Sequence, residues 1–167
     1  MAAKPPLTAR RFLEEVKACG FTHVVWLPDS ESGHLYEALR GDPALTLVPV
    51  AREGEAIPIA LGLLIGGKEP LVLIQSTGFF EQGDSLRGLA IDLALPLVLC
   101  IGYRGWTREG PLTDSAAIYL EPALQAWGLP YYLLETDDDV GVVRRALVEA
   151  RERPGPVAVL IGNEYEA

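Results

Sequence analysis

The sequence is poor in the residues that hold metal ions or cross-link a chain. Two cysteines and two histidines occur in 167 residues. Cys19 and Cys100 stand far apart in apolar surroundings and match no CxxC or metal-ligand spacing, so we expect buried thiols rather than a disulfide. His23 and His34 have no cysteine or second histidine at ligand spacing, so no metal site is expected in this chain.

Positive charge and long apolar runs are also scarce. The formal net charge of −9 would repel nucleic acids and anionic membranes, so neither is expected as a partner. The longest apolar stretch, 56–66, is too short to span a bilayer and contains Pro58. The first 16 residues lack the apolar core of a signal peptide. These absences predict a cytoplasmic protein.

Apolar runs of strand length recur along the chain. Three of them begin with proline and continue with leucine or β-branched residues: PLVLIQ, PLVLCIG and PVAVLIG. Such runs are typical of strands that are buried on both faces of a parallel sheet. Six strands are expected, at 22–28, 45–50, 70–75, 96–102, 130–135 and 156–162.

Helical patterns alternate with these strands, at about 7–19, 33–41, 54–67, 84–94, 115–127 and 138–152. This alternation predicts an α/β fold: a doubly wound, mostly parallel six-stranded sheet with helices on both faces. No linker or internal repeat divides the chain, so residues 1–167 are expected to form a single domain. Ligands of such sheets bind at the carboxyl ends of the strands. The loops expected there are 29–32, 51–53, 76–83, 103–114 and the turn near Thr136.

Glu53 stands at the junction of an expected strand and an expected helix. The helix over 54–67 is apolar on every side, which is typical of a buried helix. A carboxyl group at the entry to such a helix raises the hypothesis of a functional role. The competing interpretation is a solvated acid in the first turn that interacts favourably with the helix dipole.

Other candidates lie on the loops that follow the strands. Residues 76–78, Ser-Thr-Gly, offer hydroxyls and backbone N–H groups to a ligand, although the same residues also make ordinary loops. Phe79 and Phe80 are adjacent aromatics that suggest a hydrophobic floor or a subunit contact.

The segment YRGWTREG could bind an anionic substrate through Arg104 and an aromatic wall that includes Tyr103, or it could pack at an interface. His34 could face the mouth of the site or lie on a helix surface.

These features together resemble the pyrimidine-binding (PYR) domain of thiamin-diphosphate-dependent enzymes. More narrowly, the chain is similar to the alpha subunit of sulfopyruvate decarboxylase and to the matching N-terminal half of phosphonopyruvate decarboxylase. The resemblance covers nearly the whole chain, through GFTHVVWLPDS, LVPVAREGEAIPIALG, LVLIQSTGF and LPLVLCIGYRG. Its most specific element is Arg52-Glu53 followed by Gly62.

The resemblance implies a decarboxylase that uses thiamin diphosphate and acts on a small 2-oxo acid such as sulfopyruvate or phosphonopyruvate. In that family the glutamate after the second strand hydrogen-bonds the aminopyrimidine and promotes deprotonation of the thiazolium carbon; by resemblance Glu53 takes this catalytic role and Glu55 does not. The cofactor serves as the electron sink while carbon dioxide leaves. The implied cofactor-binding residues are Glu53, Asp29, Ser30, Ser76, Thr77, Gly78 and Phe79, and the implied substrate-binding residues are His34, Tyr103 and Arg104.

The resemblance also implies that half of the site lies elsewhere. Family members hold diphosphate and Mg²⁺ on a second domain with a Gly-Asp-Gly motif and a later asparagine. Here the candidates are 41–43 and 83–85, which do not fit, and the only asparagine is Asn163. A beta-type subunit that carries the diphosphate-binding domain is therefore expected to hold Mg²⁺ in a hetero-oligomer.

The chain departs from the family pattern at two loops. Residues 79–81 read Phe-Phe-Glu where the family pattern is similar to S-G-L-G-N, and residues 103–105 read Tyr-Arg-Gly where the alpha subunit has His-Arg-Gly. The bulky ring and the extra acid could exclude a dianionic substrate or redirect the loop.

Two other functions stay open. One is a non-catalytic binding or assembly module that keeps the fold and uses Phe79 and Phe80 as interface anchors. The other is a flavodoxin-like nucleotide binder, and the lack of a glycine-rich phosphate loop after the first strand counts against it.

Overall fold

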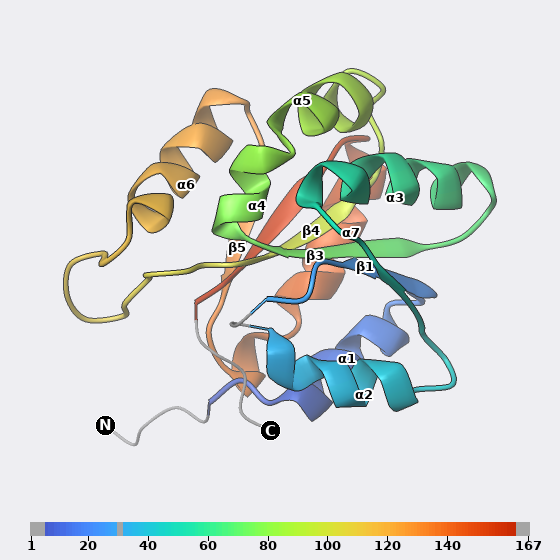
Figure 1. The fold of residues 1–167 in the computed structure, drawn as a ribbon, viewed down its shortest axis with the longest axis horizontal. Helices are drawn as coiled ribbons and strands as arrows, with labels where there is room; N and C mark the ends of the chain where they lie inside the picture. The colour runs from blue at the N-terminus through green and yellow to red at the C-terminus, as the bar shows by residue number, and fades with distance from the viewer. Residues whose placement is uncertain (1–5, 30–31, 163–167) are drawn as a thin grey trace.

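A six-stranded, all-parallel sheet forms the centre of the computed structural model, which describes residues 6–29 and 32–162 (Figure 1). The strand order is β2-β1-β3-β4-β6-β5. The strands are β1 (His23–Trp26), β2 (Thr46–Pro49), β3 (Pro70–Gln75), β4 (Val98–Gly102), β5 (Tyr131–Leu134) and β6 (Val157–Ile161). The expected doubly wound α/β fold is confirmed.

Helices cover both faces of this sheet (Figure 1). They are α1 (Ala9–Ala18), α2 (Tyr36–Gly41), α3 (Ala56–Ile65), α4 (Ser76–Glu81), α5 (Gly83–Ser85), α6 (Ser115–Ala126) and α7 (Val142–Glu152). Shorter helical turns are η1 (Gly33–Leu35), η2 (Glu53–Glu55), η4 (Asp137–Asp139) and the single π-helical turn η3 (Leu86–Ile91).

The alternation of side chains along each strand divides the core into two layers. In β1, Val24 and Trp26 pack with α1, α2 and α7, whereas Val25 packs with α3, α4, η3 and α6. The central strands β3, β4 and β6 are buried along almost their whole length. Their continuous apolar runs therefore follow from having a helical layer on each side.

The structure differs from the sequence-based expectation at three helices. The segment 76–83 was expected to be a loop, but residues 76–81 form α4 directly after β3. The helix expected at 84–94 is the short α5 followed by η3.

The third difference concerns α3. This helix was expected to be buried on every side, and for the isolated chain that expectation is wrong. One face, with Pro58, Gly62 and Ile65, is exposed, and Ile65 keeps 80% of its surface accessible. One layer of helices covers each face of the sheet, so no other part of residues 6–29 and 32–162 packs against the outer side of α3. An apolar helix face in this position is suited to contact with another molecule.

The sequence expectations about thiols and membranes can also be compared with the structure. Cys19 is half-buried and Cys100 is buried, and both are free thiols. Burial raises the pKa of the Cys19 thiol to about 11, with the neighbouring Glu15 carboxylate adding to the shift. Across the described ranges, no helix has the length and apolar character needed to cross a membrane.

The two-layer core leads to a stability prediction. Leu99 is fully buried in β4, so Leu99→Ala should lower the free energy of unfolding by about 2–5 kcal/mol through lost burial and a residual cavity. Leu93→Ala is the matched control, since Leu93 is 55% exposed, and should change it by only about 0.5 kcal/mol. Urea unfolding of both variants measures the difference, and equal losses would contradict the described core.

Candidate active site

The strand order reverses direction between β1 and β3, and this reversal defines the candidate site. From β1 the chain winds to β2 on one side, and from β3 it continues to β4 on the other. Crevices at the carboxyl ends of strands form where such a reversal occurs, because the adjoining loops turn away from each other. Here such a crevice is expected between the loop after β1 and the start of α4.

Glu53 reaches this crevice from the end of β2. Arg52 keeps an extended backbone, and the helical turn η2 begins at Glu53, so the chain changes direction at the glutamate. The Glu53 side chain lies directly against Gly78 of α4: a Cβ atom added to Gly78 would stand 2.3 Å from Glu53 Cγ and 2.7 Å from Oε1. Only glycine fits here, and the contact brings two candidates from distant parts of the sequence together.

The two glutamates of η2 have different surroundings. Glu55 Oε2 accepts a hydrogen bond from the Ala51 backbone N–H at 3.1 Å, which closes the turn that leads into α3. Among the described residues, the Glu53 carboxylate has no hydrogen-bond or ion-pair partner. Glu55 therefore has a local structural role, while Glu53 is available to a ligand.

The end of β3 adds further polar atoms without partners. Ser76 is fully buried, and neither its Oγ nor Gln75 Oε1 has a hydrogen-bond partner in the described structure. A buried polar atom without a partner costs about 1–3 kcal/mol. Thr77 is exposed and Gly78 is buried against Glu53. Residues 76–78 thus form the first turn of a helix and not a loop, and their contact with a ligand stays a prediction.

Phe79 does not line the crevice. Its ring is fully buried, with its centroid 5.5 Å from that of Trp127, so it packs into the core beneath α4. Phe79 is among the residues implied to bind the cofactor; the structure places its ring in the core, and a cofactor contact of this residue stays a prediction. Phe80 is 41% exposed instead, and helps to line a groove of about 400 Å³ between Thr77 and α6, with Asp114, Ser115, Ala116 and Tyr119.

Asp29 is part of the turn that follows β1. Its carboxylate accepts hydrogen bonds from the Ser32 backbone N–H at 2.8 Å and from Ser32 Oγ at 2.9 Å. Ser32 Oγ in turn accepts one from the indole N–H of Trp26 at 2.8 Å. Ser30 and the side chain of His34 lie outside the described residues.

The residues suggested for substrate binding on the long loop already have internal partners. The buried Tyr103 hydroxyl donates to Glu121 of α6 at 2.8 Å, and burial raises the pKa of this phenol. Arg104 pairs with Asp114 at 3.1 Å. These contacts favour a loop-bracing role within the chain, which differs from both the substrate binding and the interface packing that the sequence suggested.

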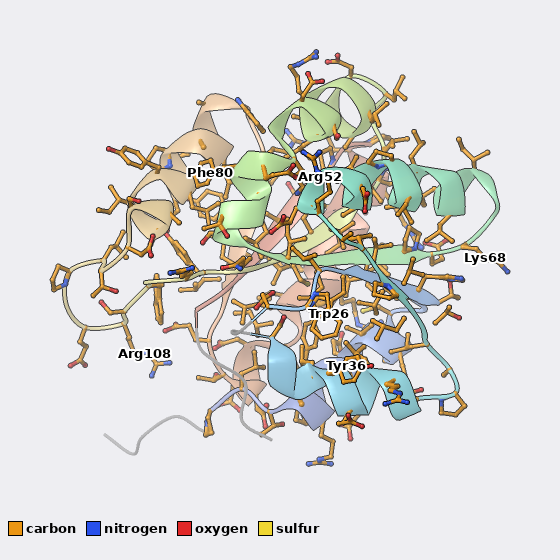
Figure 2. All side chains as sticks on the ribbon, viewed as in Figure 1. Trp26, Tyr36, Arg52, Lys68, Phe80 and Arg108 are labelled. Atoms are coloured by element: carbon orange, nitrogen blue, oxygen red, sulfur yellow. The ribbon has the colours of Figure 1, made fainter. Side chains whose placement is uncertain are left out.

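Sequence reasoning missed the position of Glu81. The Arg52 guanidinium donates to Glu81 at the end of α4, with Nε 3.0 Å from Oε1. This hydrogen bond is the main cause that holds the pKa of Glu81 below its usual value, so the pair is charged at neutral pH. Figure 2 labels Arg52 near the start of α3, and Arg108 on the long loop on the other side of the view. Only the opposite charges at positions 52 and 81 could have suggested this pair.

Comparison with known proteins adds to this geometry. No family model matches the chain. It is 24% identical to the sulfopyruvate decarboxylase alpha subunit of Methanococcus maripaludis, over 87% of this chain and 89% of that subunit. It is 26% identical to the sulfopyruvate decarboxylase of Methanosarcina acetivorans, over 72% of this chain and 32% of that protein.

The chain is similar to sulfopyruvate decarboxylase alpha subunits over most of its length. It is also 30% identical to the phosphonopyruvate decarboxylase of Streptomyces viridochromogenes, over 54% of this chain and 23% of that enzyme. The chain thus spans about a third or less of the longer relatives from Methanosarcina and Streptomyces.

Solved structures share the fold. Benzoylformate decarboxylase from Polynucleobacter necessarius superposes with a TM-score of 0.74 and 22% identity, over 97% of this chain and 31% of that one. A protein from Mycobacterium smegmatis, which has been assigned as a thiamin-diphosphate-dependent enzyme, superposes with a TM-score of 0.72. The match covers 97% of this chain and 33% of that one. The architecture is therefore that of one domain of these larger enzymes.

The contact between Glu53 and Gly78 is open to a direct test. Gly78→Ala should lower the free energy of unfolding by about 1–3 kcal/mol, because the new methyl group overlaps the Glu53 side chain. In a Glu53→Ala background most of this loss should disappear, since the overlapping atoms are gone. Gly88→Ala is the control, because its Cβ would meet no atom within 4 Å. Additive effects in this double-mutant cycle would show that the two residues are not in contact.

Proposed function

We propose that the chain is the alpha subunit of a thiamin-diphosphate-dependent 2-oxo acid decarboxylase of the sulfopyruvate or phosphonopyruvate type. In this proposal residues 1–167 form a single PYR-type domain that binds the aminopyrimidine half of the cofactor at a subunit interface. The observation that carries it is the unpartnered Glu53 carboxylate, which lies against Gly78 at the carboxyl-end crevice. The names and the shared length of the alpha-subunit relatives support the same assignment.

The residues present fit an aminopyrimidine. This ring has nitrogen atoms that donate and accept hydrogen bonds, and the crevice offers a carboxylate without a partner together with Gln75 Oε1 and Ser76 Oγ, which are buried and unpaired. Asp29, Ser30, Thr77 and the Gly78 backbone would line the same opening. Phe79 would act from beneath, by supporting α4 in the core.

Glu53 would do the chemistry that this chain contributes. Thiamin diphosphate supplies an electron sink for loss of carbon dioxide from a 2-oxo acid. Glu53 would hold and exchange a proton with a ring nitrogen, since a carboxyl group in a site closed to water is a suitable general acid and base. The apolar start of α3, including Ala56 and Ile57, would exclude water on one side.

Several features support a partner subunit. The exposed apolar face of α3 begins one turn after Glu53, so a chain that covers Pro58 and Ile65 would also approach the crevice. Among the described residues, no group of histidine, cysteine, aspartate or glutamate side chains is suited to a metal ion. We propose that a beta-type subunit in a cytoplasmic hetero-oligomer supplies the diphosphate site and most of the Mg²⁺ ligands.

For the residues expected near the substrate we propose an indirect role. His34, Tyr103 and Arg104 keep their proposed role near the substrate, but the structure gives Tyr103 and Arg104 internal partners. Their effect would then be to shape the loop that closes the site. The alternative function, a non-catalytic assembly module, is less well supported, because the relatives are named as decarboxylases.

The proposal predicts different effects for the two glutamates of η2. With the partner subunit co-expressed from the neighbouring reading frame, Glu53→Gln should lower kcat for carbon dioxide release by about 10²–10⁴-fold, because the amide cannot exchange the proton. Glu55→Gln should change kcat little, since its amide oxygen can still accept from Ala51.

The assay uses sulfopyruvate, phosphonopyruvate and pyruvate with thiamin diphosphate and Mg²⁺. Gel filtration of both variants checks that the complex still assembles. Full activity of Glu53→Gln would remove Glu53 from the mechanism. A wild-type complex that forms without binding thiamin diphosphate would favour the assembly-module alternative.

A further inference from the structure

Glu81 makes contacts with the residues on both sides of Glu53. Its carboxylate accepts from the Arg52 guanidinium, with Nε at 3.0 Å, and from the Gly54 backbone N–H. A Cβ atom on Gly54 would stand 3.0 Å from Glu81 Oε2, so the backbone passes close to the carboxylate. One side chain at the end of α4 thus binds the residue before and the residue after Glu53.

Ser85 makes a third connection between the same two segments. Its hydroxyl donates to the Gly54 carbonyl oxygen at 3.1 Å. Both backbone groups of Gly54 are therefore bonded to side chains from residues 81–85. With the Glu53 side chain against Gly78, every residue from Arg52 to Gly54 has a contact in the segment 78–85.

We propose that Glu81, through Arg52 and Gly54, is a positioning residue that fixes the turn carrying Glu53 against α4. This inference deepens the proposed function and rests on it for its catalytic meaning. The acid that departs from the family pattern after Gly78 pairs with Arg52 and lies against Gly54. Its negative charge thus acts on the residues that flank Glu53.

The geometry explains why such contacts are useful here. Glu53 has no partner of its own among the described residues, so its orientation depends on the backbone of η2 and on the close packing with Gly78. Exposed ion pairs contribute little to global stability, because solvent screens the charges. A carboxylate that also accepts a backbone N–H restricts one turn, and this local effect matters where small displacements reduce turnover.

Hydrogen–deuterium exchange of the purified chain tests the proposal without needing decarboxylase activity. In Glu81→Ala, peptides that cover residues 51–56 should exchange several-fold faster, because the Gly54 N–H loses its acceptor. Glu81→Gln should restore much of the protection, since its amide oxygen can accept the same bonds. Asp84→Ala is the matched control: it removes the exposed ion pair of Asp84 with Arg87, which involves no side chain of η2.

Turnover of the co-expressed complex supplies the second measurement. Glu81→Ala should lower kcat by roughly ten- to a hundredfold with KM for the 2-oxo acid nearly unchanged, and Glu81→Gln should recover most of it. Unchanged exchange in Glu81→Ala would overturn the proposal, and so would faster exchange together with wild-type kcat. If the wild-type complex shows no turnover, the proposed function fails, and the exchange result alone decides whether Glu81 fixes the turn.

Discussion

The strands β3, β4 and β6 have almost no side chain that faces solvent, because each residue packs into one of two helical layers. This burial on both faces depends on parallel strands with crossover helices on both sides of the sheet: α2 and α7 on one side, and α3, α4, η3 and α6 on the other. Parallel strands all end at the same edge, so the segments after β1, β2 and β3 converge there. The position of Glu53 near Gly78 is a consequence of this arrangement, although 25 positions separate the two residues in the chain.

Two features near Glu53 lower the stability of the fold: a carboxylate without a partner and buried polar atoms without hydrogen bonds in the described part of the chain. The Glu53 carboxylate has no partner among the described residues, and neither do the buried polar atoms of Gln75 and Ser76 at the end of β3. Glu55, Glu81 and Ser85 of the neighbouring segments have hydrogen-bond partners, whereas the buried side-chain amide of Gln82 has none in the described structure. Polar groups that remain unpaired inside a well-bonded frame are expected where a ligand completes the hydrogen bonding.

The outer face of α3 points to the same conclusion from packing. A helix without a polar side chain is stable when it is covered, yet the chain covers only the side that carries Ala56, Ile57 and Ala60. This chain covers about a third of each similar solved structure, 31% and 33% of their lengths. An exposed apolar helix face is suited to contact with another molecule.

The sequence by itself determined the fold class and the six strands, and it singled out Glu53 as a candidate site residue. Those features depend on local patterns: apolar runs flanked by proline, and a carboxyl group between a strand and an apolar helix. The three-dimensional structure decided which polar side chains are free. Burial of Phe79, the pairing of Arg104 with Asp114 and the contacts of Glu81 with Arg52 and Gly54 all join residues from different crossovers. Periodicity within one segment contains no information on such contacts, because they arise only when the sheet brings the segments to a common edge.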